Sequence, residues 1–283
     1  MNETKCETKC GTKSQSPQSL KSRQPRLVDA HCHLEHKRFA ADIDAVIARA
    51  RDAGFEHAIN AGSSPQANEQ ILRLLEKHAP FLKTVLGLSP HDAHAEGDAG
   101  LQRSLAFLEK NKEKIMGVGE IGLEFHYFKR EEERESQRRA FRAQLDWARD
   151  NALPVVVHSR EASAETLSFL RPHNGAKVWH CFGESELASD ALAAGCFLSL
   201  PTLKSSSAVI HSAPLERLLC ETDSPFLSLR GKSADGKSAD GKSARNEPAE
   251  ARWVYEEIAR VKQKPFDEVA ARVRENVRVV FGF

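Results

Sequence analysis

The sequence has no long apolar run, few aromatic residues and almost no net charge. Phe, Trp and Tyr make up 7% of its 283 residues, and 41 Lys and Arg face 40 Asp and Glu. No stretch is apolar for long enough to serve as a membrane span or a signal peptide, so we expect no membrane segment and a cytoplasmic location. A net charge of +1 argues against a strong nonspecific polyanion binder, so any contact with nucleic acid must be a local patch.

Cysteine and glycine patterns exclude two further classes of protein. The six cysteines are scattered, which is not the pattern of a secreted disulfide framework. No G-x-G-x-x-G motif follows the first predicted strand, so little supports a doubly wound dinucleotide-binding sheet. Two segments have side chains that are too polar or too small to form a buried core. Residues 1–26 are rich in Lys, Ser, Thr and Gln, and residues 231–244 repeat Gly-Lys-Ser-Ala, so we expect disorder in the first and mobility in the second.

The rest of the chain, residues 27–283, alternates between predicted strands and predicted helices. Apolar strand candidates occur at 27–33, 55–60, 81–88, 115–121, 153–158, 176–181, 196–200 and 218–221. Helical segments are predicted at 40–53, 65–77, 100–110, 131–150, 161–170, 184–194 and 203–211, followed by 248–262 and 266–281. Eight strands alternating with helices predict an α/β fold, a single-domain (β/α)8 TIM barrel.

Residues of metal-ligand type stand at the ends of these strands. His31 and His33 are two residues apart on the first strand, so their side chains point to the same face. The others, each at or just after a later strand, are Glu120, His158, His180 and Asp223. In a (β/α)8 barrel the carboxyl ends of the strands meet at the catalytic rim. Six such groups are too many for one open catalytic site and suit two divalent ions that share a bridging carboxylate. The identity of the ions, among Zn, Mn, Mg, Co and Fe, stays open.

Six sequence blocks resemble, in order, the signature blocks of the TatD family of metal-dependent deoxyribonucleases. They are D-A-H-C-H-L (29–34), G-V-G-E-I-G-L-E (117–124), V-V-V-H-S-R (155–160), W-H-C-F (179–182), C-E-T-D-S-P-F (220–226) and R-N-E-P-A-E (245–250). The resemblance covers about residues 27–283. It implies a TIM barrel with two ions, one held by His31, His33 and Asp223 and the other by His158 and His180. Glu120 then bridges the two ions, and the implied activity is stepwise hydrolysis of DNA from a 3′ end.

The chain departs from the family pattern at four places. The family's G-x-H-P-H reads Gly87-Leu88-Ser89-Pro90-His91, so Ser89 replaces the first histidine. Glu124 stands where the family has Asp, Gly183 stands where it has serine, and residues 230–245 replace a short connection. None of these changes removes a predicted ligand. They bear on substrate preference more than on hydrolysis.

Several further residues are predicted to act on the substrate, each with a structural alternative. Asp223 is the expected general base and can otherwise be a ligand only. Arg160 is expected to bind a phosphate oxygen, or else to pair with Glu161 or Glu165. His91 can touch phosphate or cap the following turn, and Glu124 can orient a water or a neighbour. Arg245 and Asn246 can contact phosphate, or serve only as a loop before the helix that begins at Pro248.

Three functions remain open from the sequence. The first is a deoxyribonuclease, which hydrolyses single-stranded or end-frayed DNA as a monomer. The second is a hydrolase of another ester or amide, since one barrel fold supports many chemistries. The third is a weakly active nucleic-acid-binding factor, and retention of all six ligand-type residues argues against it.

Overall fold

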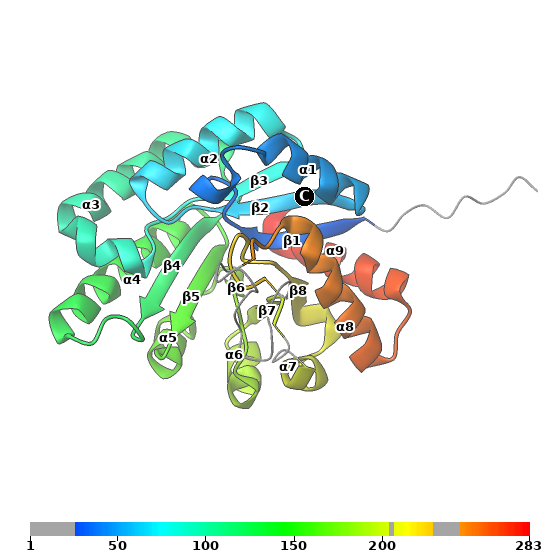
Figure 1. Ribbon diagram of the computed structural model, residues 1–283. Helices are drawn as coiled ribbons and strands as arrows, with labels where there is room; N and C mark the ends of the chain where they lie inside the picture. Colours follow the sequence, from blue (N-terminus) through cyan, green and yellow to red (C-terminus); the bar gives the residue numbers. More distant parts are fainter. Residues whose placement is uncertain (1–25, 204–206, 229–243) are drawn as a thin grey trace, which may run out of the picture.

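The computed structural model describes residues 26–203, 207–228 and 244–283 (Figure 1). Residues 1–25 of the predicted disordered extension and residues 231–243 of the Gly-Lys-Ser-Ala repeat lie outside the described residues. None of the helices in the described part of the chain is long and apolar enough to cross a membrane.

The described residues form eight parallel strands that close into a barrel (Figure 1). The strands are β1 (Leu27–Cys32), β2 (Phe55–Ala61), β3 (Leu82–Val85), β4 (Val118–Glu124), β5 (Val155–Arg160), β6 (Lys177–Trp179), β7 (Cys196–Leu200) and β8 (Leu218–Cys220). Hydrogen bonds join β1-β2-β3 and β4 through β8, each in sequence order. Bridges between Leu86 and Val118 and between Cys32 and Ser224 join the two sets. The predicted (β/α)8 TIM barrel is therefore confirmed.

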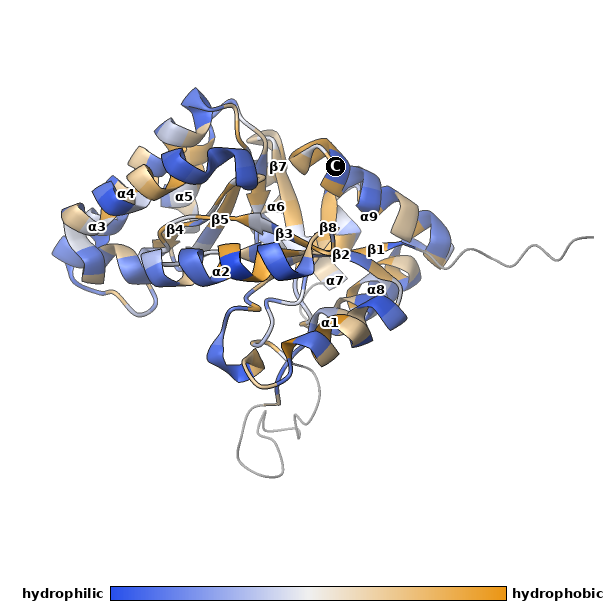
Figure 2. Ribbon diagram, turned by 90° about the horizontal axis from the view of Figure 1, so that it is seen from above, coloured by the Kyte–Doolittle hydropathy of each residue, from blue (hydrophilic) through white to orange (hydrophobic). Residues whose placement is uncertain are grey.

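The helices lie outside the strands, with hydrophilic residues on their outer faces (Figure 2). They are α1 (Ile43–Asp52), α2 (Pro65–His78), α3 (Pro90–Asn111), α4 (Glu131–Asp150), α5 (Ser163–Leu170), α6 (Ala188–Ala193), α7 (Ser207–Ser212), α8 (Arg252–Lys262) and α9 (Phe266–Phe281). Short 3-10 turns Lys37–Phe39, Lys112–Lys114, Ser185–Leu187, Leu215–Arg217 and Pro248–Ala251 accompany them. The predicted bounds of α4 and α9 are confirmed.

Helix α3 begins ten residues before the predicted start at Gly100. Ser89 caps it by accepting a hydrogen bond from the backbone N–H of Asp92, and Pro90 occupies the first turn, where proline suits a helix. Gly97 interrupts the helix with φ 60° and ψ −166°, a backbone conformation that favours glycine. The apolar pattern begins only after this break, which explains why the sequence indicated the later start.

Strands β4 and β5 extend further than their predicted ends at residues 121 and 158. Their register pairs Gly122 with His158 and Glu124 with Arg160, so the hydrogen-bonded ladder continues past both predicted ends. Glu120 therefore lies inside its strand. The consequence for the site is that Arg160 stands beside Glu124, one strand repeat beyond His158.

The core has an outer and an inner part. Val155 and Val157 of β5 pack outward into the cluster beneath the helices, whereas Val156 belongs to a second cluster. This second cluster takes its apolar side chains from seven strands, namely Val28, Ala30, Ile59, Ala61, Val85, Val156, Val178, Phe197 and Leu219. Val277, Val280 and Phe281 of α9 complete it, so α9 covers one end of the barrel and leaves the polar residues for the other.

Candidate metal centre

The structure brings all six predicted ligand side chains together inside the barrel. They come from five parts of the chain: β1, β4, β5, and the residues that follow β6 and β8. His31, His33, Glu120 and His180 are buried, and His158 and Asp223 are partly buried. Their ligand atoms face one another. Polar residues that merely cluster on the surface would not need to be arranged in this way.

The first group of ligand atoms lies between β1 and the turn after β8. The Nε2 atoms of His31 and His33 are 3.2 Å apart. Asp223 Oδ1 lies 3.3 Å from His33 Nε2 and 3.8 Å from His31 Nε2. This turn is held in place because the Asp223 N–H donates to the His31 carbonyl at 2.9 Å and the His33 N–H donates to the Ser224 carbonyl at 2.7 Å.

The second group lies between β5 and the residue that follows β6. His158 Nδ1 and His180 Nε2 are 3.2 Å apart, and Glu120 Oε1 lies 2.7 Å from the former and 3.2 Å from the latter. The other oxygen of this carboxylate, Oε2, faces the first group, at 3.6 Å from His33 Nε2 and 3.8 Å from His31 Nε2. Glu120 therefore offers one oxygen to each group.

These distances fit divalent ions. Ligand atoms at the corners of a tetrahedral zinc site, with bonds of about 2.0–2.1 Å, are about 3.3 Å apart. The atoms of both groups are 2.7–3.8 Å apart, a range centred near this value, and imidazole nitrogens with carboxylate oxygens form the donor set that zinc and related ions prefer. Each group can hold one ion, with Glu120 as the shared ligand.

The charges of the cluster also suit cations. Burial alone would raise the pKa of Glu120, but the imidazoles of His180 and His158 hold that pKa well below its usual value. Burial would lower the pKa of His180, but Glu120 and Glu221 raise it well above the usual value. Burial, His180 and His33 all lower the pKa of His31. The lowered pKa favours the ionised form of Glu120, whose charge calls for positive charge nearby, from protons or from metal ions.

In three of the histidines, the ring nitrogen that faces away from the ligand groups contacts a carboxylate or carbonyl oxygen. His33 Nδ1 is 3.0 Å from the Ala61 carbonyl, and His158 Nε2 is 3.2 Å from Glu124 Oε2. His180 Nδ1 is 3.3 Å from Oε1 of Glu221, which also accepts the Cys181 N–H at 2.7 Å. Such contacts orient imidazole ligands and make them better donors. The orienting role predicted for Glu124 agrees with this contact.

Glu221 is a functional candidate that the sequence analysis did not single out. Its side chain is fully buried beneath His180, and Oε2 has no hydrogen-bond partner in the described part of the chain. Its position was a usable signal, because it stands directly after an apolar strand and two residues before Asp223. The same spacing made His31 and His33 candidates.

Gly122 lets β4 and β5 approach closely enough to build the second group. Its φ is 141°, and a Cβ atom there would lie 2.0 Å from the His158 carbonyl oxygen. Any side chain would push away the strand segment that carries this histidine. The glycine in G-E-I-G-L is therefore required by the packing at His158.

Two of the predicted substrate contacts are corrected by the structure. Arg245 binds Asp42 at 2.6 and 2.8 Å and Glu247 at 2.7 Å, so its guanidinium is already paired. Asn246 is fully buried and donates to the carbonyl of Thr222 at 2.8 Å, just before Asp223. Both residues hold the protein's own loops in place, and neither presents its polar group to a ligand.

Arg160 and His91 lie at the mouth of the barrel, near the ends of β4 and β5. The Arg160 side chain is exposed, with its guanidinium carbon 5.1 Å from the centre of the Tyr127 ring. Its alternative partners bind elsewhere, since Glu161 pairs with Lys129 and Glu165 pairs with Arg138. Arg160 therefore remains available for a phosphate.

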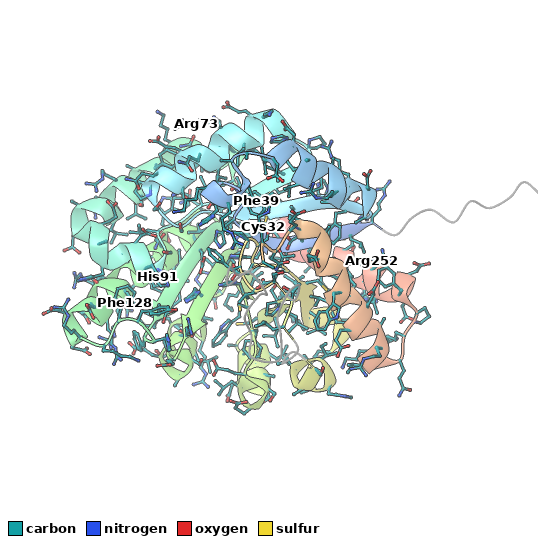
Figure 3. All side chains as sticks on the ribbon, in the orientation of Figure 1. Cys32, Phe39, Arg73, His91, Phe128 and Arg252 are labelled. Carbon is teal, nitrogen blue, oxygen red and sulfur yellow. The ribbon has the colours of Figure 1, made fainter. Side chains whose placement is uncertain are left out.

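His91 also reaches this mouth (Figure 3). Its side chain is 47% exposed, and its Nε2 atom lies 3.7 Å from Glu124 Oε2. Ser89, and not His91, caps the helix, so the capping alternative is wrong. His91, Glu124 and His158 form a third set of ligand-type atoms.

Comparisons with known proteins identify a family that this chain matches. A model of the family described as TatD related DNase matches residues 28–282. The chain is 29% identical over 270 residues to an uncharacterized metal-dependent hydrolase, YabD, of Bacillus subtilis, covering 90% of this chain and 98% of that protein. It is 31% identical over 272 residues to the 3′-5′ ssDNA/RNA exonuclease TatD of Dickeya dadantii, covering 90% and 97%. The crystal structure of the TatD homologue YjjV of Escherichia coli superposes with a TM-score of 0.80 and 27% identity, covering 92% of this chain and all of that one.

Proposed function

Because this chain belongs to the TatD-related DNase family, we propose that it is a two-metal nuclease that shortens single-stranded DNA stepwise from its 3′ end. The family makes it a metal-dependent hydrolase that acts on ester bonds. The observation that carries the finer proposal is the position of Glu120, with one oxygen toward His158 and His180 and the other toward His31 and His33. A shared carboxylate of this kind suits two ions held close together.

The residues divide the chemistry among them. His31, His33 and Asp223 would hold one ion, His158 and His180 the other, with Glu120 between them. Two such ions would supply Lewis acids for the phosphodiester and make a water nucleophilic at neutral pH.

Asp223 is the proposed general base. Its Oδ1 atom faces His33, so its second oxygen can accept the proton of the attacking water. Water attack breaks the bond between phosphorus and the leaving oxygen, which becomes the 3′ hydroxyl of the shortened strand.

Arg160 and His91 are the proposed phosphate contacts. Arg160 stands one strand repeat beyond His158 and is exposed, so its guanidinium can reach an oxygen of a phosphate at the ions. His91 approaches from the start of α3. Their combined charge is small, in keeping with a protein that grasps a short strand end. A cytoplasmic location and a monomeric state stay predictions from the sequence.

The test uses short strands labelled at either end. The metal-loaded protein should convert a 5′-labelled single strand of DNA into a ladder that shortens one nucleotide at a time, whereas a 3′ label should leave at once in a mononucleotide. Chelation should stop both reactions, and the same strand in RNA or in a blunt duplex measures the substrate preference.

Glu69→Gln is a matched control, because Glu69 lies on the exposed face of α2 and pairs, among the described residues, only with Arg73. It should behave as the unaltered protein does. If no strand were hydrolysed with any of the five candidate ions while a simple ester was, the chain would be a hydrolase of another substrate class.

A further inference from the structure

Large apolar side chains are exposed at only a few places in the described residues. They are Tyr127 at 62%, Phe226 at 43% and Val279 at 60%. Val279 belongs to α9, the helix that covers the far end of the barrel. The two aromatic residues follow β4 and β8, so they stand at the same end of the barrel as the metal-ligand groups. Exposed aromatic rings beside a catalytic cluster call for a functional explanation.

Tyr127 lies beside the second group of ligands. Its ring centre is 5.6 Å from that of His91, and the Arg160 guanidinium lies against it at 5.1 Å. Arg160 is two residues beyond the ligand His158 on the same strand. The tyrosine ring thus packs on His91 and on Arg160, which is near the ligand His158 on β5, while most of the ring surface faces solvent.

Phe226 lies beside the first group of ligands. Its backbone N–H donates to the Asp223 carbonyl at 2.9 Å, so the turn that carries the ligand also carries the ring. The ring meets His33 edge-on, with 6.0 Å between the ring centres, and meets His36 at 5.5 Å. This phenylalanine is therefore fixed relative to the ion site as closely as the tyrosine is.

The two rings pack on opposite sides of the barrel. The barrel closes through a bridge between β1 and the segment after β8, so β1 and β5 lie across an eight-stranded ring from each other. Phe226 packs on His33, which directly follows β1, and Tyr127 packs on Arg160 of β5. A phosphodiester held by the ions would have one ring on each side.

This arrangement matches the chemistry of a nucleic-acid strand. Every internal phosphate joins two nucleosides, one on each side of the phosphorus atom. Aromatic side chains bind unpaired bases by stacking, and stacking tolerates any sequence because every base has a π-face. A paired base is stacked in its own duplex and must be pulled out before it can lie on a protein ring.

We propose that Tyr127 and Phe226 stack on the two nucleobases that flank the phosphodiester to be cut. The pair of rings then makes unpaired strands the preferred substrate and makes cleavage independent of sequence. This inference rests on the proposed nuclease function and specifies which residues give it its substrate class.

The test compares strands in which one base is missing. Either the 3′-terminal or the next nucleotide is replaced by a sugar analogue without a base, and kcat and KM are measured for each strand. We expect the unaltered protein to lose about tenfold in kcat/KM for each missing base, which corresponds to about 1.4 kcal/mol. The loss should appear mainly in KM, because stacking binds the strand before and during the reaction alike.

Substitutions assign each ring to one base. Tyr127→Ala and Phe226→Ala should each lower kcat/KM on the intact strand by about tenfold. In each variant, the missing base should no longer matter at one of the two positions, and this position should differ between the two variants. The losses caused by removing a ring and by removing its base are then not additive. Tyr127→Phe should restore the dependence on the base, because it restores the ring. Val279→Ala, an equally exposed change on α9, should leave every strand unaffected.

The possible outcomes separate the two proposals. If the unaltered protein cuts intact and base-free strands equally well, the stacking proposal is overturned and the nuclease function stands. The same holds if both alanine variants keep the full dependence on both bases. If no strand is cut at all, the nuclease function fails and the stacking proposal falls with it.

Discussion

The inside of the barrel has an apolar layer and a polar layer. At three strands, a residue of the polar layer stands two positions after a residue of the apolar layer. Val156 precedes His158 on β5, Val178 precedes His180 near the end of β6, and Leu219 precedes Glu221 after β8. Side chains two residues apart share a face of a strand, so each pair lies one above the other. The apolar members are almost fully buried, and α9 closes the barrel beneath them.

The apolar layer serves the stability of the fold, and the polar layer, two residues away along each strand, serves its function. Burial of the apolar layer stabilises the fold by about 25 cal/mol for each Å² removed from water. Burial of the polar layer costs free energy unless each charge finds a partner. The barrel therefore tolerates these charges only at the end where ions and substrate can reach them, and each layer should respond to mutation in its own way.

The largest expected effect belongs to the polar layer. Glu120→Gln removes the charge that faces both ligand groups, so kcat/KM for a single strand should fall by at least about a thousandfold, equivalent to about 4 kcal/mol in the barrier. The metal-free protein should also lose some stability, because His158 and His180 lose the charge that pairs with them. Kinetics and thermal unfolding of the same preparation measure the two quantities, with Glu69→Gln as the control. A variant that keeps full activity would contradict the shared-ligand model.

The apolar layer should lose stability without losing activity. Leu219→Ala removes a fully buried side chain and should lower the free energy of unfolding by about 3 kcal/mol, the usual cost of such a cavity. Denaturant unfolding measures this loss, which should be the same with and without metal. Activity per folded molecule should change little. If this substitution abolished metal binding while stability was preserved, the two layers would not be separate.

Glu221→Gln tests whether a residue that contacts a predicted ligand, without being a ligand itself, affects metal binding. Glu221 touches His180 on the side away from the ions, and loss of such a partner usually weakens metal binding by about tenfold to a hundredfold. Metal titration of the purified variant measures the change. Glu216→Gln, an exposed change on the neighbouring 3-10 turn, should have no effect. Equal affinity in both variants would show that Glu221 serves only the fold.

The smallest effect is the pH dependence of stability in the metal-free protein. Burial would lower the pKa of His33, but Asp223 and Glu35 raise it well above its usual value, and the pKa of His180 is likewise raised. A raised imidazole pKa stabilises the fold fully below about pH 6.5, the unfolded value, and this contribution is lost as pH rises through the folded pKa. The pKa of Glu120 is lowered, so its contribution is present above the unfolded value and is lost only in acid.

The melting temperature of metal-free protein should therefore fall as pH rises above about 6.5. The metal-loaded protein should keep its melting temperature over the same range, because ions replace the protons. A parallel decline in both forms would contradict this account of the polar layer.

Local patterns in the sequence were sufficient to predict the fold and to single out the six side chains that the barrel brings together. Strand alternation placed His31 and His33 on one face, and the alternation of strands with helices indicated the closed barrel. The ends of β4 and β5 were missed, because a strand ends where its partner's hydrogen bonds end, and the partner is set by register. The start of α3 was missed because Gly97 separates its polar first part from its apolar second part.

Long-range contacts account for the wrong substrate assignments. Arg245 binds Asp42 across 203 positions of sequence, and Asn246 binds Thr202 across 44. The adjacent sequence reveals neither Asp42 nor Thr202, and only Glu247 is a near neighbour of Arg245 that also binds it, so both residues looked free to bind phosphate. Arg160 differs because its neighbours Glu161 and Glu165 pair elsewhere, with Lys129 and Arg138. Whether a basic residue is available thus depends on the fold as a whole.

The most direct test of the central claim counts the metal ions that activity requires. Metal-free protein is titrated with Mn²⁺ while bound metal and hydrolysis of a single strand are measured on the same samples. The position of Glu120 between the two ligand groups predicts that hydrolysis reaches its maximum at two ions per chain and is negligible at one. Full activity with one ion bound would contradict the account.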